Sequence, residues 1–123
     1  MANSEKKPRP IVPIPNSADV QKPIELFQSE VLRPILKVQH DILVATFHYT
    51  RRNFSDDWEE LKKNKKSKLI SDLILKNGPL KNTLIGIVVG QLEGDEIEEY
   101  LQDKKEYDRR ITRMTIQRIQ STI

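Results

Sequence analysis

Cysteine is absent from the sequence, and its absence excludes several chemistries at once. The chain has no disulfide framework, no thiolate ligand for a metal and no thiol nucleophile. Aromatic residues are scarce, at 6% of the chain, and they are not interleaved with the basic clusters as base-stacking surfaces require. Glycine occurs four times, and the spacing of a glycine-rich phosphate loop is missing.

The sequence also has no hydrophobic run long enough to span a membrane. Its most apolar stretch, 84–89, is far shorter than the ~20 residues that a spanning helix needs. The opening residues are polar and lead into prolines, so the apolar centre of a secretory signal is missing too. We therefore expect a cytoplasmic protein.

What the sequence does contain is charge and helical periodicity. Of its 123 residues, 37% are hydrophobic and 32% are charged, a balance that fits one soluble domain. The net charge is +3, but acidic residues cluster at 93–103 and basic residues follow at 104–118. Alternating strand patterns and internal repeats are not found. The sequence predicts an all-α fold: a compact bundle of about five to six short helices around a central apolar helix at 79–92.

Residues 1–22 are predicted to form an extended or disordered proline-rich arm before the helical domain at 23–123. Four prolines in this arm fix φ and remove amide donors, so the stretch is not helical. Chain ends of this kind are commonly disordered. The alternative is an arm that crosses a neighbouring subunit and buries its apolar β-branched residues, Ile11, Val12 and Ile14.

Periodicity predicts the inner faces of the first helices. For a helix over 34–52, the expected inner face is Ile35, Val38, Ile42, Ala45 and Tyr49, with Leu36, Leu43 and Phe47 on its flank. Ser55 is expected to cap the short helix that follows, with its buried side made by Trp58, Leu61 and the nearby Phe54.

The same reasoning applies to two later helices. One should end at 77–78 in a left-handed conformation, and its inner face should be Leu69, Ile70, Leu73 and Ile74. A short acidic helix after the turn at 93–95 should face inward with Ile97, Tyr100 and Leu101.

The central helix at 79–92 is expected to have apolar or small residues on both sides. Each glycine in a helix interior costs about 1 kcal/mol relative to alanine, so two glycines on one face indicate a close neighbour. We expect close helix packing at Thr83, Gly86 and Gly90. A bound small molecule at this face is the alternative.

The last helix, from 104 to about 121, carries two apolar stripes on opposite sides. The first stripe, Tyr107, Ile111 and Met114, is expected to face the core. The second stripe needs another partner, and a second copy of the chain is one candidate. This stripe is the predicted oligomer interface: Ile116, Ile119 and Ile123.

The only two histidines lie eight residues apart on one polar helix face. At ~1.5 Å per residue, His40 and His48 are separated by about 12 Å along the axis, too far to share one ion. The stripe Glu96, Glu99 and Asp103 lacks the Glu-x-x-His motif of di-metal bundles. We therefore assign no catalytic, cofactor or metal residues. An enzyme or small-ligand binder using the His40/His48 face is the third hypothesis for function.

Two clusters of basic residues support the second hypothesis, binding of nucleic acid or another polyanion. Lys105, Arg109 and Arg113 share one face of the last helix. A second cluster contains Lys62, Lys63, Lys65, Lys66 and Lys68.

A set of mostly apolar and small residues gives the chain a resemblance to known proteins. The set is Phe27, Leu32-Arg33-Pro34-Ile35-Leu36-Lys37, Gln39, Leu80, Asn82, Leu84, Gly86, Gly90 and Tyr100. Over about residues 23–121, the chain resembles a group of short all-helical bacterial proteins without an established activity. Some members of that group carry a glyoxalase label. Glyoxalase-like folds need strand-rich units with His and Glu ligands, so the resemblance implies a helical fold and leaves the function open.

The leading hypothesis is a small helical interaction protein without catalytic activity of its own. We expect it to form a homodimer or a higher homo-oligomer, or to bind another protein.

Overall fold

The computed structural model describes residues 23–54 and 57–123. Within these ranges every regular element is helical, which confirms the predicted all-α class. The elements are α1 (Pro23–Phe27), a π-helical turn η1 (Gln28–Leu32), α2 (Arg33–Val38), α3 (His40–Arg51), a 3-10 turn η2 (Trp58–Glu60), α4 (Lys63–Lys76), α5 (Gly78–Val89), α6 (Asp95–Gln102) and α7 (Lys104–Gln120). The expectations for the arm, with Ile11, Val12 and Ile14, and for Ser55 as a cap lie outside the described residues.

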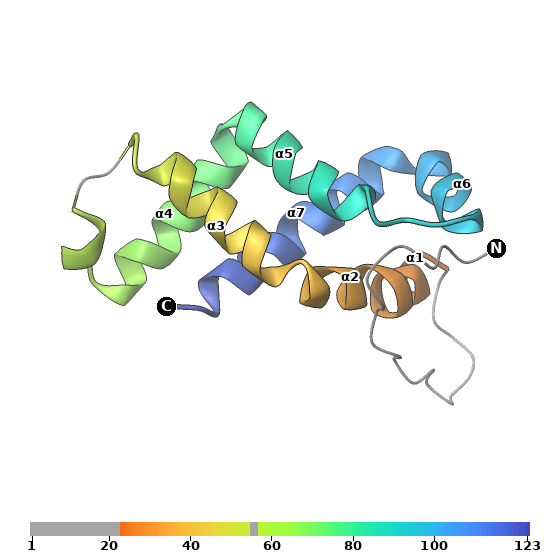
Figure 1. Ribbon diagram of the computed structural model, residues 1–123, viewed down its shortest axis with the longest axis horizontal. Helices are drawn as coiled ribbons and strands as arrows, with labels where there is room; N and C mark the ends of the chain where they lie inside the picture. Colours follow the sequence, from red (N-terminus) through yellow and green to blue (C-terminus); the bar gives the residue numbers. More distant parts are fainter. Residues whose placement is uncertain (1–22, 55–56) are drawn as a thin grey trace.

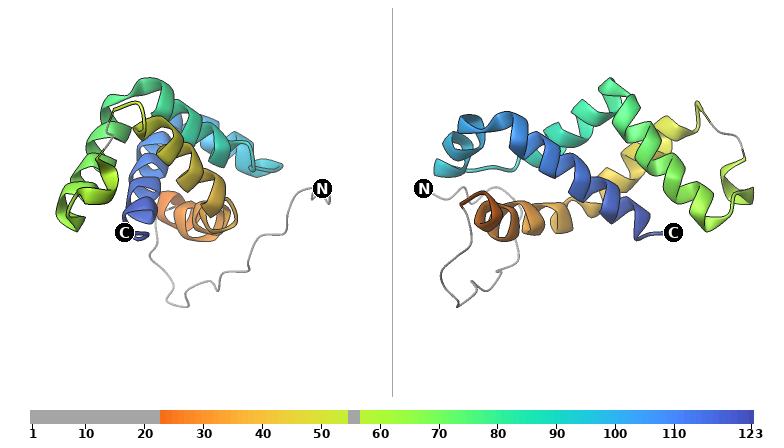
Figure 2. Two further views of the ribbon diagram at one scale, coloured as in Figure 1. Left: turned by 60° about the vertical axis from the view of Figure 1, so that its left-hand side comes forward. Right: turned by 180° about the vertical axis from the view of Figure 1, so that it is seen from behind.

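The helices form one elongated bundle around α7. In Figure 1, α3 and α5 cross in front of α7, and the view from behind in Figure 2 shows α7 running diagonally from α6 toward α4. Helix α7 contacts α3, α4, α5 and α6, whereas α5 contacts α3, α4 and α7. Both figures place α4 and α6 at opposite ends of the molecule. None of the helices in the described part of the chain is long and apolar enough to cross a membrane.

Helix α7 is covered on both of its apolar sides by the same chain. Ile111 and Ile119 are fully buried, and the Tyr107 ring packs against the Phe27 ring at a centroid distance of 4.7 Å. Ile116 is also in the core, with 8% of its surface exposed, and Ile123 is partly buried against it. The premise that Ile116, Ile119 and Ile123 need a second chain to cover them was therefore wrong.

The predicted helix over 34–52 is broken at Gln39, which separates α2 from α3. Gln39 has φ −92° and ψ 13°, outside the helical region, so the apolar faces of the two segments do not continue into each other. In α3 the buried residues are Leu43 and Phe47. The predicted inner face of this segment was wrong: Ala45 is exposed, and Ile42 and Tyr49 are 49% and 72% exposed.

Helix α5 lies between its neighbours with only one side fully covered. Its buried residues are Leu80, Leu84 and Val88. The opposite side is exposed at Thr83, Gly86 and Gly90, and a Cβ built on Gly86 would meet no atom within 4 Å. Among the described residues no helix packs closely against these three, so the expected close helix packing stays a prediction for a contact outside them.

Candidate functional site

An apolar groove runs along the outer side of α4, with a volume of about 550 Å³. Its floor is made by four large apolar side chains, Phe54, Leu61, Leu69 and Leu73. Its rim and end are polar: Lys65, Lys68, Asp72, Lys76 and Asn77. The groove is therefore an apolar surface bordered mainly by positive charge.

The width of the apolar face on α4 explains why the groove exists. Ile70 and Ile74 are fully buried in the bundle. Leu69 and Leu73 each precede one of these residues, so they lie about 100° away around the helix, given 3.6 residues per turn. They are only partly buried and line the groove. Thus only half of the predicted inner face is fully buried.

Phe54 forms one side of the groove from the segment that follows α3. The sequence placed Phe54 near a buried cluster, but 62% of its surface is exposed. Trp58, four residues later in the sequence, is buried instead. The aromatic side chain is thus held at the surface beside Leu61, where it adds apolar area to the groove.

Helix α4 carries most of the positive charge around the groove. Its sequence holds five lysines and one aspartate, a formal charge of +4. Lys68 Nζ donates to Asp72 Oδ2 at 2.8 Å, which raises the pKa of Lys68 and lowers that of Asp72. Lys65 and Lys76 have no ion pair with any described carboxylate. Both ammonium groups are exposed, and Lys76 is near enough to Asp72 to help lower the pKa of that carboxylate.

The corner between α4 and α5 fixes one end of the groove. Asn77 Oδ1 accepts a hydrogen bond from Leu80 N at 2.9 Å and so caps α5. Pro79 occupies the first turn of α5, as predicted, where its missing amide costs nothing. Asn77 has φ −102°, so the predicted left-handed end at this position was wrong.

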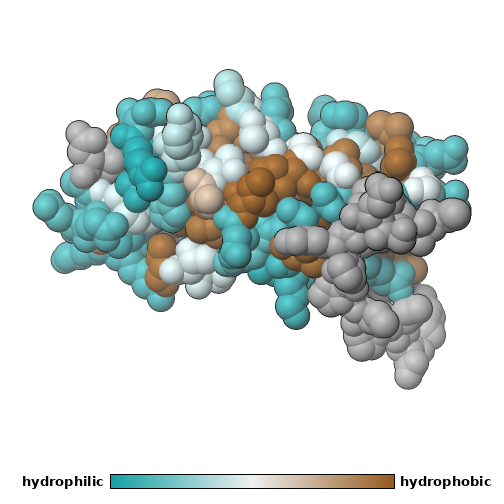
Figure 3. Space-filling view, viewed as in Figure 1, coloured by the Kyte–Doolittle hydropathy of each residue, from teal (hydrophilic) through white to brown (hydrophobic). Residues whose placement is uncertain are grey.

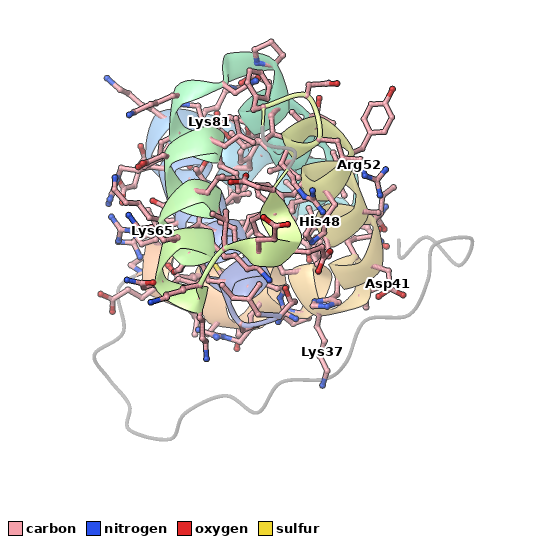
Figure 4. All side chains as sticks on the ribbon, turned by 90° about the vertical axis from the view of Figure 1, so that its left-hand side faces the viewer. Lys37, Asp41, His48, Arg52, Lys65 and Lys81 are labelled. Atoms are coloured by element: carbon pink, nitrogen blue, oxygen red, sulfur yellow. The ribbon has the colours of Figure 1, made fainter. Side chains whose placement is uncertain are left out.

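Basic side chains from α3 and α4 surround the Trp58 ring, which lies beside the groove. The Arg51 guanidinium lies 4.8 Å from the centre of the indole ring, and Lys66 Nζ lies 5.3 Å from it. Such cation–π contacts are worth roughly 0.5–1 kcal/mol at exposed sites. Figure 4 views the molecule from this end, with Lys65 on the α4 side and His48 and Arg52 on the α3 side. Basic side chains gather at this end of the bundle, although Asp57, Glu59 and Glu60 beside Trp58 are exposed there too.

His48 belongs to this cluster as a structural partner. Its Nδ1 accepts a hydrogen bond from Arg51 Nε at 3.0 Å, and its ring packs edge-on against Trp58. Burial, followed by the charge of Arg51, lowers the pKa of His48 below its usual value. The imidazole is therefore held in its neutral form, as the hydrogen bond from Arg51 requires.

The two histidines do not form a common site. Whereas His48 contacts Arg51, His40 Nδ1 lies 3.3 Å from Arg118 Nη1 of α7. Arg118 also lines a small cavity of about 250 Å³ with Arg33 and Gln28. In residues 23–54 and 57–123, no three His, Cys, Asp or Glu side chains are grouped so that they can hold a metal ion.

The predicted basic face of α7 is partly neutralised. Arg109 donates to both carboxylate oxygens of Glu106, at 2.9 Å and 2.5 Å, and Arg110 Nε donates to the same group at 2.8 Å. These hydrogen bonds lower the pKa of Glu106 to about 2. Lys105 and Arg113 remain exposed on this face. The structure thus leaves two of the three predicted contact residues available.

Helix α6, at the opposite end of the bundle, is the acidic counterpart of α4. Its eight residues include four acids and no base, a formal charge of −4. Of the three predicted inner residues, only Tyr100 is buried, and its hydroxyl donates to Asp108. Ile97 and Leu101 are 45% and 58% exposed, so the prediction for these two was wrong. They form an apolar ridge on an acidic helix.

Two tyrosines hold this acidic end to the core. Tyr107 Oη donates to Glu99 Oε2 at 2.9 Å, as Tyr100 does to Asp108. Burial, together with these bonds to carboxylates, raises the pKa of both phenols well above the usual range. The tyrosines therefore fix the orientation of α6 against α7 and leave its Ile97/Leu101 ridge facing outward.

Comparison of the chain with protein-family models, with curated proteins and with solved structures found no match. The candidate site is therefore argued from the geometry of the groove, to which α4, Phe54 and Leu61 contribute. Sequence reasoning missed the groove, although a signal was present. Four apolar residues at 69, 70, 73 and 74 make a face wider than one neighbouring helix covers, and lysines border it.

Proposed function

We propose that this chain is a non-catalytic interaction protein whose α4 groove binds an acidic amphipathic helix of another polypeptide. The observation that carries the proposal is the pairing of an apolar floor, Leu61, Leu69 and Leu73, with a lysine rim. Amphipathic helices dock into apolar grooves through side chains spaced at i, i+3 and i+4. Carboxylates beside that stripe would pair with Lys65 and Lys76.

The apolar floor favours a protein partner over a polyanion. A nucleic acid would contact the lysines through its phosphates, but it would gain little from the exposed area of Leu73 and Phe54. A helix with leucines on one face buries that area, at roughly 25 cal/mol per Å² of apolar surface removed from water. The partner is therefore expected to be acidic and amphipathic.

A designed peptide tests this function directly. The probe is a helical peptide with leucines at i and i+4 and glutamates on the flanks, titrated into the ¹⁵N-labelled full chain. Amide shifts should concentrate at Leu69, Leu73 and Lys76. Leu73→Ser should weaken binding at least tenfold, while the matched control Leu75→Ser, on the same helix but outside the groove, should leave it unchanged.

Two further probes separate the alternatives. The same peptide with lysines in place of glutamates should not bind, because it meets the rim with like charge. A short single-stranded DNA represents the polyanion class. Three results together would contradict the proposed binding of a protein. The DNA would change the amide chemical shifts of α4, Leu73→Ser would leave those changes intact, and the acidic peptide would cause no changes. A shift confined to Lys105 and Arg113 would instead favour polyanion binding at α7.

A further inference from the structure

The acidic ridge of α6 has the chemistry that the α4 groove requires. We propose that the groove of one copy receives the Ile97/Leu101 ridge of a second copy of this chain. The inference rests on the proposed function of the groove and names its occupant. The function of the groove would then be self-association of this chain.

The shape of the ridge fits the groove. Ile97 and Leu101 are four residues apart, so they project from the same side of α6 as adjacent knobs. Both are about half exposed and have no cover within the described residues. Glu98 is exposed on the same helix beside them. A ridge of two apolar side chains next to carboxylates is the pattern inferred above for the partner.

The charges of the two elements are complementary. Helix α4 carries five lysines and one aspartate, and α6 carries four acids and no base. The contact therefore brings formal charges of +4 and −4 together. Complementary potentials of this kind orient the partners and speed their encounter. They also make the association sensitive to salt, because the rim charges are exposed.

The positions of the two elements require a second copy. Helices α4 and α6 lie at opposite ends of the bundle in both Figure 1 and Figure 2. A ridge therefore cannot reach the groove of its own chain. Each copy offers one ridge and one groove, so the contact joins two unlike surfaces. Two reciprocal contacts about a twofold axis would give an isologous antiparallel pair, and one contact to each neighbour would give a heterologous head-to-tail series.

Other occupants from this chain fit less well. Residues 1–22 hold four basic and two acidic residues, the same net sign as the rim. Figure 3 shows apolar side chains near the middle of one face, over α3 and α5. On α3, Ile42 is half exposed. That patch has no charge pattern that would match a lysine border. The α6 ridge combines half-exposed apolar side chains with a helix that carries four acids and no base.

Sedimentation velocity on the full chain and two single variants tests the proposal. Leu101→Lys disables the ridge, and Leu73→Lys disables the groove. At high micromolar concentration the parent should have an apparent mass above that of the 14.4 kDa monomer. Each variant should have the apparent mass of the monomer. The control Leu75→Lys changes a residue that is 53% exposed on α4 but outside the groove, and it should associate like the parent.

Mixing the two variants gives the sharper result. The intact groove of the Leu101→Lys chain and the intact ridge of the Leu73→Lys chain should combine in a species of twice 14.4 kDa. A symmetric contact through any other surface cannot be restored in this way. Because Leu73 is partly buried, a second groove variant, Lys65→Glu with Lys76→Glu, reverses the rim and leaves the apolar floor intact. It should behave like Leu73→Lys.

Several results would overturn the inference. They are a monomeric parent, an association that survives both groove variants, an association abolished by Leu75→Lys or Ile42→Lys, and a mixture that stays at 14.4 kDa. The designed acidic peptide distinguishes this failure from that of the proposed function. If the parent is monomeric and the peptide still binds at Leu69 and Leu73, the groove serves another protein. If neither associates, both proposals fail.

Discussion

Thr115 carries a buried hydroxyl without a hydrogen-bond partner in the part of the chain that the structure describes. Its side chain is fully buried on α7, in the centre of the bundle. A buried polar group without a partner costs about 1–3 kcal/mol, and replacing it with an apolar group of the same shape removes that cost. Thr115 is thus a local weak point in an otherwise apolar core.

We predict that Thr115→Val raises the free energy of unfolding by about 1 kcal/mol. The measurement is urea unfolding followed by circular dichroism. Thr112→Val is the matched control on the same helix, because the Thr112 hydroxyl donates to the Asp108 carbonyl at 2.8 Å. The control should give no increase. Equal gains from both substitutions would show that the unpaired hydroxyl is not the cause.

His48 makes stability depend on pH in the weakly acidic range. Because its pKa is lowered in the folded state, the unfolded chain binds more protons as the pH falls below the ordinary value of 6.5. The contribution of the neutral imidazole is present above pH 6.5 and is lost as the pH falls toward the lowered pKa. Arg51 and the Trp58 ring then meet a second positive charge.

We predict a lower free energy of unfolding at about pH 5.5 than at about pH 7.5. His48→Gln should reduce this difference, because glutamine still accepts a hydrogen bond from Arg51 but does not titrate. Urea unfolding of both proteins at the two pH values provides the measurement. An unchanged pH dependence in the variant would assign the effect to other groups.

At the scale of the element, α5 contains an exposed glycine that the fold does not require. Gly86 lies in a helix, and no atom of the described residues comes within 4 Å of the position of a Cβ. Gly→Ala in a helix interior is worth about 1 kcal/mol when space is available. Gly94 is the opposite case, since its φ of 55° before α6 is a conformation that other residues rarely adopt.

We predict that Gly86→Ala stabilises the protein by about 1 kcal/mol and that Gly94→Ala destabilises it. Thermal unfolding at low protein concentration measures both effects without interference from association. A lower melting temperature for Gly86→Ala at low concentration would contradict the prediction. If the substitution lowers the melting temperature only at high protein concentration, another chain packs closely against α5, and the expected close helix packing is intermolecular.

The helices themselves were largely predictable from the sequence, and the faces they bury were less so. Pro79 marks the start of α5, and the apolar spacing of Ile70 and Ile74 identifies the buried side of α4. The break at Gln39 has no proline or glycine to announce it, so α3 was rotated relative to the prediction. Ile97 is exposed because no other described helix packs on its side of α6. Which faces are covered depends on tertiary packing, which the local pattern of apolar residues does not give.

For the molecule as a whole, the buried apolar residues form one cluster that includes Trp58 at the α4 end. The Trp58 ring contacts Phe47 of α3 at a centroid distance of 6.0 Å. A small domain with one contiguous core usually unfolds in a single cooperative transition. The fluorescence of Trp58, the only tryptophan, therefore reports on the whole fold.

We predict that unfolding curves from Trp58 fluorescence and from far-ultraviolet circular dichroism coincide. Urea titration of a dilute sample, with both signals recorded, makes the comparison. A fluorescence transition at lower urea would mean that the α3–α4 end opens before the rest, and the groove would then belong to a separately unfolding unit.

The candidate site also shows what only the assembled molecule reveals. The lysines of α4, the acids of α6 and the apolar residues within each helix can all be identified in the sequence. Their separation to opposite ends of the bundle depends on how α7 aligns the two helices. Leu73 and Leu101 read as core residues in the sequence, and the packing of the chain leaves both at the surface.

Helix α7 connects the two ends of the molecule mechanically. Its 17 residues span about 25 Å, it contacts α4, and Asp103 alone separates it from α6. In a head-to-tail series, tension entering at the α6 ridge would pass along the hydrogen-bonded backbone of α7 and leave through α4. Because α7 meets α4 through packed side chains, such a filament would yield first at its non-covalent contacts, while the helix between them kept its length.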